Sequence, residues 1–207
     1  MGVKVISRPP DYAHLIGAGL AGTMKKASMY LQSSADRKIR SGIMPANAPL
    51  TQEVKRGSQT LRDNGELMKS IAPHSGELWA DASTNLAYAR IQQNGGTIRP
   101  KNAKALFIPA SDKTRMLMRR YGARSPRLLI EAMKADGYDF FSVGKAFFAC
   151  KERAGKRGKR GEVFILFIIS KSVKIPPRPF LYIDEKDQEY LMKLVQEGVM
   201  NALKRRS

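Results

Sequence analysis

Three glycines near the N-terminus have the spacing of a dinucleotide-binding loop. Gly17, Gly19 and Gly22 match the pattern GxGxxG, but that fingerprint requires a strand directly before it and an acidic residue about 20 residues further on. Here two prolines separate the glycines from the only preceding strand-like segment, Val3–Ile6, and the periodicity around them predicts a helix. We interpret the glycines as small residues that let this helix pack closely against a neighbour.

Metal ligation and nucleophilic catalysis need clustered side chains that the sequence does not indicate. His14 and His74 are the only histidines, and no acidic cluster or cysteine pair accompanies either of them. The single cysteine, Cys150, could pair with a histidine as a nucleophile, but any chain with two histidines allows that pairing. Because Cys150 follows the apolar stretch Ala146–Ala149, we expect a small buried residue there.

One further motif combines a glycine with a lysine. Gly144 and Lys145 have the order found at the end of a phosphate-binding loop, but position 139 is Asp where that loop requires its first glycine. The carboxylates are scattered and lie mostly in predicted helices. We therefore predict a protein without catalytic activity, cofactor or metal.

The composition describes a folded and strongly basic chain. Its 207 residues are 43% hydrophobic, which is enough for a core and fits one domain or one domain with an insertion. Lys and Arg number 37 against 18 Asp and Glu, and the net charge of +19 predicts polyanions or acidic proteins as partners. The single cysteine excludes an intramolecular disulfide and is typical of a protein folded in a reducing cytosol.

Neither a secretory signal nor a membrane span is predicted. The N-terminus lacks a sustained apolar segment, and the longest apolar run, Val163–Ile169, is far shorter than the roughly 20 residues of a membrane helix. Its β-branched and aromatic residues predict a strand that is buried on both faces.

The helices and strands that would position these residues are predicted from the spacing of the apolar residues. Apolar residues recur at helical spacing from Tyr12 to Ile39, after an N-cap at Asp11. Shorter helices are predicted over Thr51–Lys55, Leu61–Ile71, Asn85–Gln93, Lys113–Tyr121 and Pro126–Ala135. Strands are predicted over Glu77–Ala82, Ala105–Ile108, Tyr138–Cys150 and Glu162–Val173. With a final helix capped by Asp184, the sequence predicts an α+β fold with a long N-terminal helix, an antiparallel sheet with a long basic hairpin, and a C-terminal helix.

The segment from Lys151 to Gly161 is predicted to form the tip of that hairpin. It contains one acidic residue, three glycines and six basic residues: Lys151, Arg153, Lys156, Arg157, Lys159 and Arg160. The sequence leaves open whether this tip is only solvated, contacts DNA in a channel, or meets an acidic face of a partner. No aromatic residue lies within it, so stacking on single-stranded bases is not expected there.

Three separate segments carry a resemblance to a known family. LRDNGELMKSI (61–71) follows Thr51 and Lys55, NLAYARIQQNGG spans 85–96, and IPPRPFLYI spans 175–183. Their order and spacing resemble the phage virion morphogenesis family, which includes the tail-completion proteins of contractile-tailed and Mu-like phages. The stretch 98–106 is similar to the start of an insertion in the longer members. Two local departures are Met44–Asn47, where the family has a glycine–tryptophan segment, and Pro177, which replaces an alanine.

The resemblance implies a single domain over residues 1–207 with an insertion at about 101–161, acting as a structural protein in the virion. Such a protein would form a homo-oligomeric ring of six or twelve copies in the neck or at the head-proximal end of the tail, after assembly in the bacterial cytoplasm. Its partners would be the tail tube or terminator, the head connector or adaptor, and phage DNA in the channel. The hairpin Tyr138–Val173 and the first helix are predicted to supply the contacts.

Particular residues of these segments have predicted structural roles. Gly65 is expected to interrupt a helix, and Tyr88 to bury its ring while its hydroxyl reaches a polar partner. Arg178 stands between prolines that fix the direction of the final helix, and is predicted to pair with a carboxylate inside the domain or across a subunit boundary. Together with the six basic residues of the hairpin tip, it is a candidate contact to a partner or to DNA. The alternative to the phage role is a basic nucleic-acid-binding protein that contacts phage DNA.

Overall fold

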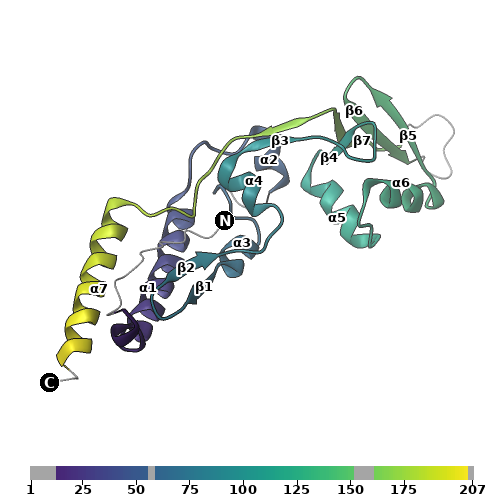
Figure 1. Ribbon diagram of the computed structural model, residues 1–207. Helices are drawn as coiled ribbons and strands as arrows, with labels where there is room; N and C mark the ends of the chain where they lie inside the picture. Colours follow the sequence, from purple (N-terminus) through teal and green to yellow (C-terminus); the bar gives the residue numbers. More distant parts are fainter. Residues whose placement is uncertain (1–12, 56–58, 152–160, 205–207) are drawn as a thin grey trace. The chain divides into compact units, whose positions relative to one another are not determined.

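The computed structural model describes residues 13–55, 59–151 and 161–204, with the side-chain environment of the first helix from Leu20 onward. These residues form an α+β fold with a long N-terminal helix, antiparallel sheets and a C-terminal helix, which confirms the predicted fold class (Figure 1). The helices are α1 (Ala13–Ser41), α2 (Pro49–Val54), α3 (Glu66–Ser70), α4 (Ala89–Asn94), α5 (Asp112–Arg120), α6 (Pro126–Ala135) and α7 (Glu185–Lys204). The strands are β1 (Ala72–Ser75), β2 (Ala80–Ser83), β3 (Gly96–Ile98), β4 (Leu106–Pro109), β5 (Tyr138–Val143), β6 (Ala146–Lys151), β7 (Val163–Ser170) and β8 (Val173–Ile175).

The chain divides into two compact units. The first unit consists of Met1–Ala46, Gln59–Gly95 and Pro176–Ser207, and the second of Asn47–Ser58 and Gly96–Ile175. The second unit is therefore formed by two segments that interrupt the first unit in sequence. The insertion predicted at about 101–161 lies inside the longer of these segments.

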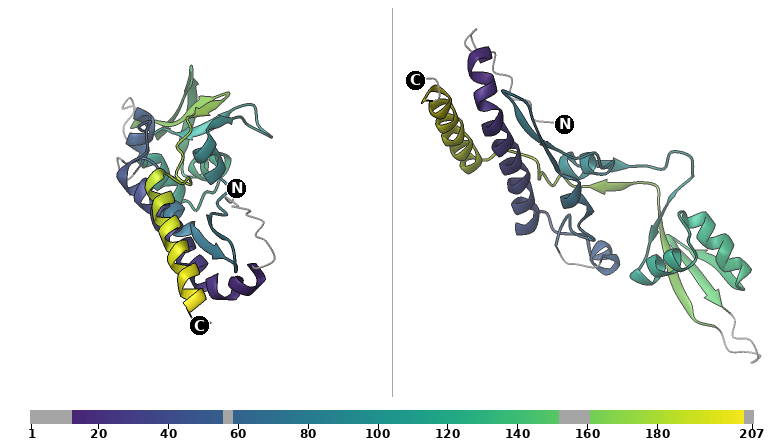
Figure 2. Two further views of the ribbon diagram at one scale, coloured as in Figure 1. Left: turned by 60° about the vertical axis from the view of Figure 1, so that its left-hand side comes forward. Right: turned by 90° about the horizontal axis from the view of Figure 1, so that it is seen from below.

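In the first unit, α1 packs against α7 and against the β1–β2 hairpin (Figure 2). The predicted apolar periodicity of α1 is confirmed, because its buried apolar residues recur at helical spacing. The buried apolar residues of α1 are Leu20, Met24, Ala27, Ala35 and Ile39. The two helices are antiparallel, because Ser34 of α1 lies at the start of α7 and Thr23 lies near its C-terminal half.

The close approach between these helices occurs at a glycine of α7. A Cβ atom added to Gly198 would lie 2.8 Å from Cγ2 of Thr23, so any larger residue requires Thr23 or the helix to move. At Gly22 nothing lies within 4 Å of such an atom. The predicted role of Gly22 in close packing is therefore wrong within this chain, and the side-chain surroundings of Gly17 and Gly19 lie outside the described residues.

The segment before β1 is less helical than its sequence predicts. Only Glu66–Ser70 of the predicted helix 61–71 is helical, because Leu61 and Gly65 both have positive φ angles, of 59° and 80°. Gly65 thus precedes α3 as its N-cap residue and does not interrupt a longer helix. β1 then pairs with β2 in antiparallel register, from Ala72 opposite Ser83 to Ser75 opposite Ala80.

The second unit contains a four-stranded antiparallel sheet in the order β4-β7-β6-β5. The predicted strand 138–150 is two strands joined by a turn at Gly144, whose φ is 58°. Helices α5 and α6 cover one face of this sheet (Figure 1). The core between the helices and the sheet is formed by Leu129, Met133, Ala149, Leu166 and Phe167, with further aromatic rings around them.

A short ribbon of β3 and β8 completes the second unit. Gly96 pairs with Ile175 and Ile98 with Val173. The positive φ angles of Gly95 and Gly96, at 70° and 149°, end α4 as predicted and turn the chain into β3. The strand predicted over Glu162–Val173 is therefore divided into β7 and β8, each with a different partner.

Candidate binding surfaces

The structure describes one of the six basic residues of the predicted hairpin tip. Lys151 ends β6, is exposed, and places its Nζ atom 4.8 Å from the ring centroid of Tyr138. Cys150 pairs with Val163, so the two arms of the predicted hairpin are adjacent strands. The other five predicted contact residues lie outside the described residues: Arg153, Lys156, Arg157, Lys159 and Arg160.

Arg178, the remaining predicted contact residue, is buried in the first unit. Its Nε donates to the carbonyl oxygen of Pro45 at 2.8 Å, and its Nη2 donates to that of Ala46 at 3.0 Å. Burial lowers the pKa of the guanidinium from its ordinary value. The prediction of a carboxylate partner is wrong for this chain. The guanidinium binds two backbone carbonyls instead, because the loop 45–46 brings both of them within its reach. Its role toward a partner or DNA stays a prediction.

Gln93 joins the end of α4 to the loop before α7. Its Oε1 accepts from the backbone N–H groups of Phe180 at 2.8 Å and Leu181 at 3.0 Å, and its Nε2 donates to the carbonyl of Leu181 at 2.9 Å. The backbone N–H of Arg178 donates to the carbonyl of Gln92 at 2.7 Å. A single side chain thus satisfies three backbone groups of a loop that has no strand partner.

The three segments that carry the family resemblance meet in one core. Leu67 and Ile71 come from the first, Ala89 from the second and Phe180 from the third, and all four are buried together against Ala35 and Ile39 of α1. Gln32 of α1 also donates to the carbonyl of Ile71 at 2.7 Å. Residues about 110 positions apart in sequence therefore form a single packed cluster. Tyr88, in contrast, is 41% exposed, so the predicted burial of its ring is wrong.

A buried carboxylate fixes the start of α7 against α1. Asp187 accepts from Ser34 Oγ at 2.7 Å and from Lys38 Nζ at 2.6 Å. Lys38 also donates to the carbonyl of Tyr182 at 2.6 Å, with Nζ 3.8 Å from the centroid of that ring. Burial opposes ionisation of Asp187, but the bonds from Lys38 and Ser34 outweigh it and lower its pKa to about 2.

The N-terminus of α7 has the cap that the sequence predicts. The backbone N–H of Asp187 donates to Oδ1 of Asp184 at 2.9 Å, which confirms Asp184 as the capping residue. In return, the N–H of Asp184 donates to Oδ2 of Asp187 at 3.3 Å. Asp187 therefore closes a capping box as well as the ion pair with Lys38. The predicted cap at Asp11 lies outside the described residues.

The helix pair of the first unit has several exposed apolar side chains. The ring of Tyr30 on α1 stacks on Tyr190 of α7 at 4.0 Å between centroids. Beyond this stack, α7 is buried fully only at Asp187 and Gly198. The exposed apolar residues of the pair are Met29, Tyr190, Met192, Met200 and Leu203.

The sheet of the second unit has an uncovered apolar face, opposite α5 and α6. We call it the open sheet face and define it by Phe141, Val143, Phe148, Cys150, Val163 and Ile165. Side chains alternate along a strand, so these residues point away from the core that holds Phe140, Ala149 and Phe164. Val163 and Ile165 are 45% and 40% exposed, which corrects the predicted burial of this strand on both faces.

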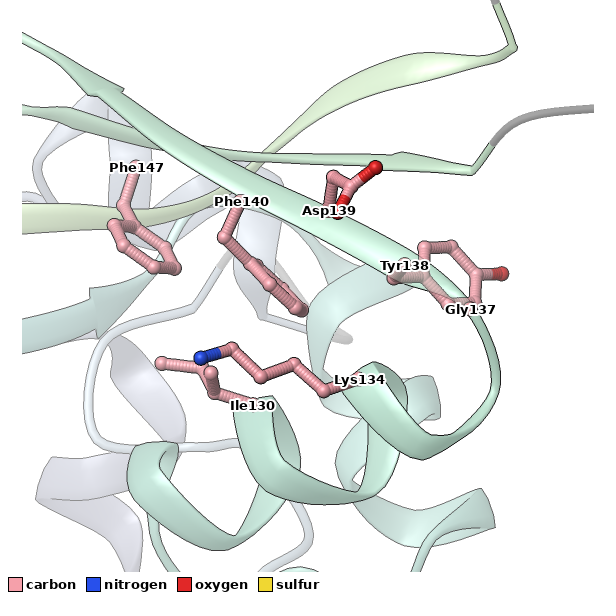
Figure 3. Close-up of a pocket in the computed structure, with 7 residues that line it drawn as sticks. All are labelled: Ile130, Lys134, Gly137, Tyr138, Asp139, Phe140 and Phe147. Carbon is pink, nitrogen blue, oxygen red and sulfur yellow. The ribbon is translucent and has the colours of Figure 1, made fainter.

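A groove of about 720 Å³ lies between α6 and β5 on the helix-covered side of the sheet (Figure 3). Phe140 and Phe147 point from the sheet toward α6, and the side chain of Lys134 extends below them beside Ile130. Asp139 points to the other side of the strand. The groove therefore presents one amino group beside apolar rings, without a carboxylate or nucleophile directed at the same point.

The described residues contain no group of three His, Cys, Asp or Glu side chains that could hold a metal ion. Cys150, predicted to be a small buried residue, is half-buried within β6. His74 lies exposed on β1. Within the same part of the chain, no helix is long and apolar enough to span a membrane.

No protein-family model, curated protein or solved structure shows significant similarity to this chain.

The sequence did not predict the roles of Asp187 and Gln93, which hold α7 and the loop before it on the first unit. Asp187 stands three residues after Asp184, and this spacing of two acidic residues before an apolar helix is the signal that could have indicated a capping box. Gln93 lies in a segment that the resemblance singled out, but its three bonds to the loop 180–181 depend on a long-range approach that no local pattern predicts.

Proposed function

We propose that this chain is a structural protein of a tailed phage, which completes the tail or joins it to the head by forming a ring in the neck region. The observation that supports this most is the shared core of Leu67, Ile71, Ala89 and Phe180. These residues come from the three segments that resemble the phage virion morphogenesis family. A chance resemblance of three short segments gives no reason for them to pack on one another.

The exposed surfaces suit a role in assembly. A ring forms when one surface of a subunit binds a different surface of the next copy and the rotation closes. The exposed apolar side chains of α1 and α7 and the open sheet face are candidates for two such surfaces, on different units of the chain. Binding to neighbours through them would be the whole mechanism, with no chemical step.

The test is the location of the protein in purified virions of a phage that carries this gene. Antibodies against the chain, labelled with gold, are expected to bind at the junction between head and tail. Quantitative mass spectrometry is expected to give six or twelve copies per particle. Absence of the chain from washed virions, or gold distributed along the tail, would contradict the proposal.

A nucleic-acid-binding role is the second candidate, and the distribution of charge favours it. Nineteen of the 37 basic residues, but only six of the 18 acidic residues, lie between Gly96 and Ile175. This role predicts that the protein stays bound to duplex DNA above about 0.5 M salt through many phosphate contacts. Release at much lower salt would leave the structural role as the better proposal.

A further inference from the structure

Four arginines surround the turn that joins α5 to α6. Arg119 and Arg120 end α5, Arg124 lies in the turn, and Arg127 lies in the first turn of α6. We call these four residues the arginine corner. All four are exposed, and no Asp or Glu occurs between positions 113 and 130. The corner is therefore a positive surface that consists wholly of described residues.

Backbone hydrogen bonds fix the path of the turn that carries the corner. The N–H of Ala123 donates to the carbonyl of Met118 at 2.8 Å, and Gly122 has a φ of 61°. This is the pattern of a Schellman cap at the C-terminus of α5. The hydroxyl of Ser125 then accepts from the N–H of Leu128 at 3.3 Å and begins α6. The four arginines thus extend from a backbone whose own hydrogen bonds are satisfied.

Helix dipoles explain the position of two of these arginines but not of the other two. Cations in the last turn of a helix are stabilised by its dipole, which accounts for Arg119 and Arg120. Arg127 lies at the opposite, positive end of α6, whose first turn contains no acidic residue, and Arg124 directly precedes its N-cap residue. The dipole of α6 disfavours both of these cations. An anion bound at the corner would offset this repulsion.

Ion pairs within the chain neutralise only part of this charge. Arg119 and Arg127 have a carboxylate on their own helix, at 3.9 Å and 2.8 Å. The side chains of both pairs are 47–87% exposed, so these pairs stabilise the fold little and can exchange for another anion. Arg120 and Arg124 form no ion pair with another described residue.

The composition of the corner favours phosphate groups over a protein surface. Charged residues are depleted in the centres of protein interfaces, whereas guanidinium groups form bidentate pairs with phosphates. Duplex DNA carries one negative charge per about 1.7 Å of its axis, so a corner of several arginines meets several phosphates. The ring of Tyr121 packs on the core and its hydroxyl donates to Asp136, so this ring is not available to stack on unpaired bases.

We infer that the arginine corner binds the phosphate backbone of double-stranded nucleic acid without reading its sequence. Contacts to phosphates fix a protein on the duplex but carry no sequence information. The inference rests on the nucleic-acid role that is the second candidate above, and it does not depend on formation of a ring. It uses none of the basic residues predicted at the hairpin tip.

Anisotropy of a fluorescent DNA duplex of about 30 base pairs tests the inference on the full chain between about 0.05 and 0.5 M salt. The variant R120Q/R124Q/R127Q is expected to bind at least about 30-fold more weakly at about 0.1 M salt, because each arginine removed releases a phosphate. The slope of log K against log salt should become smaller by about 2–3. An affinity and a slope equal to those of the wild-type chain would overturn the inference.

The variant K25Q/K26Q/K193Q is the matched control. It has the same net charge as the corner variant but removes exposed cations from α1 and α7, so its affinity should decrease less than about threefold. Both variants should keep the melting temperature of the wild-type chain within a few degrees, because all of the substituted side chains are exposed. Equal losses of affinity would show that net charge alone determines binding, and the inference would be wrong.

Modification of the wild-type chain by phenylglyoxal gives a second readout that needs no variant. Bound duplex is expected to slow the modification of Arg120 and Arg124 at least about fivefold, as measured by mass spectrometry of peptides. Arg90, which is exposed on α4, should react at the same rate with and without DNA. Unchanged rates at Arg120 and Arg124 under conditions where the duplex is bound would overturn the inference.

Three further outcomes separate this inference from its alternatives. If polyglutamate binds as tightly as the duplex and is lost in the corner variant, an acidic protein surface is the partner and the inference is wrong. Tighter binding of oligo-dT than of the duplex would likewise contradict it. If no DNA binds at about 0.05 M salt, the nucleic-acid role itself fails. If the duplex binds the wild-type chain and the corner variant equally, that role stands and only the site is wrong.

Discussion

Nζ of Lys38 lies 2.6 Å from Oδ2 of Asp187, and the two side chains are 10% and 3% exposed. This pair connects the C-terminal part of α1 to the first turn of α7. Because both groups are desolvated, removal of one partner leaves the other charge in the interior with a more exposed ionic neighbour only, Arg37 at 4.0 Å from Asp187 or Asp184 at 3.3 Å from Lys38. The pair therefore helps to hold the C-terminal helix on the first unit, together with the Tyr30–Tyr190 stack and the close approach at Gly198.

Lys38→Met is expected to destabilise the protein by about 3 kcal/mol, since the buried carboxylate of Asp187 loses its nearest cation and keeps, among the described residues, only Ser34, Tyr30 and, at 4.0 Å, Arg37 as side-chain partners. Urea denaturation followed by circular dichroism measures this loss. Lys186→Met is the control, because Lys186 is exposed at the start of the same helix. A loss below about 0.5 kcal/mol in Lys38→Met would show that the pair does not hold α7.

The ion pair of Lys38 and Asp187 also makes the free energy of unfolding depend on pH in the acidic range. The pKa of Asp187 in the folded chain is about 2, below its ordinary value of 3.8, so the unfolded chain takes up this proton first as the pH falls. The resulting stabilisation of about 2 kcal/mol is complete above about pH 5 and is lost as the pH decreases toward 2. Asp187→Asn should lower stability at pH 7 and flatten this part of the profile. If the stability of Asp187→Asn falls between about pH 4 and about pH 2 as steeply as that of the wild-type chain, the account is contradicted.

Two glycines in the helix pair give opposite predictions for the same substitution. Gly198→Ala places a methyl group against Thr23 and is expected to destabilise the protein by about 1–3 kcal/mol. Gly22→Ala meets open space on a helix and is expected to stabilise it by about 0.5–1 kcal/mol. Thermal melts of the two variants check both signs. Similar effects of the two substitutions would show that α1 and α7 do not pack as described.

Two neighbouring glutamines provide a matched test of the motif core. Gln93→Leu leaves the N–H groups of Phe180 and Leu181 without their acceptor and is expected to cost about 2–4 kcal/mol. Oε1 of Gln92 is buried without a hydrogen-bond partner, so Gln92→Met should be neutral or slightly stabilising. Both free energies of unfolding come from urea titrations. Equal losses would mean that Gln93 does not hold the loop before α7.

Elements with strong local signals were predictable from the sequence. Helix α6 begins and ends where predicted, because Ser125 accepts from the N–H of Leu128 at 3.3 Å and Pro126 occupies the first turn. The cap at Asp184 was predictable for the same reason. The long periodicity of α1 needed no tertiary information, because its buried residues repeat at helical spacing over many turns.

Elements that depend on distant partners were not predictable. β1 contains a proline and a histidine and has weak strand propensity, but it forms where β2 and α1 pack against it. The apolar run 163–169 is compatible with a strand that is buried on both faces and with a strand that has one uncovered face. A run without alternation of apolar and polar residues does not indicate which face is covered. The candidate surfaces therefore required the structure, whereas the family resemblance came from the sequence.

The most direct test of the proposed role is electron microscopy of lysates from a phage in which this gene is disrupted. If the chain completes the tail or joins it to the head, filled heads should lie beside detached or abnormally long tails, and expression of the wild-type chain from a plasmid should restore joined particles. Normal, joined virions in the absence of the gene product would contradict the structural role.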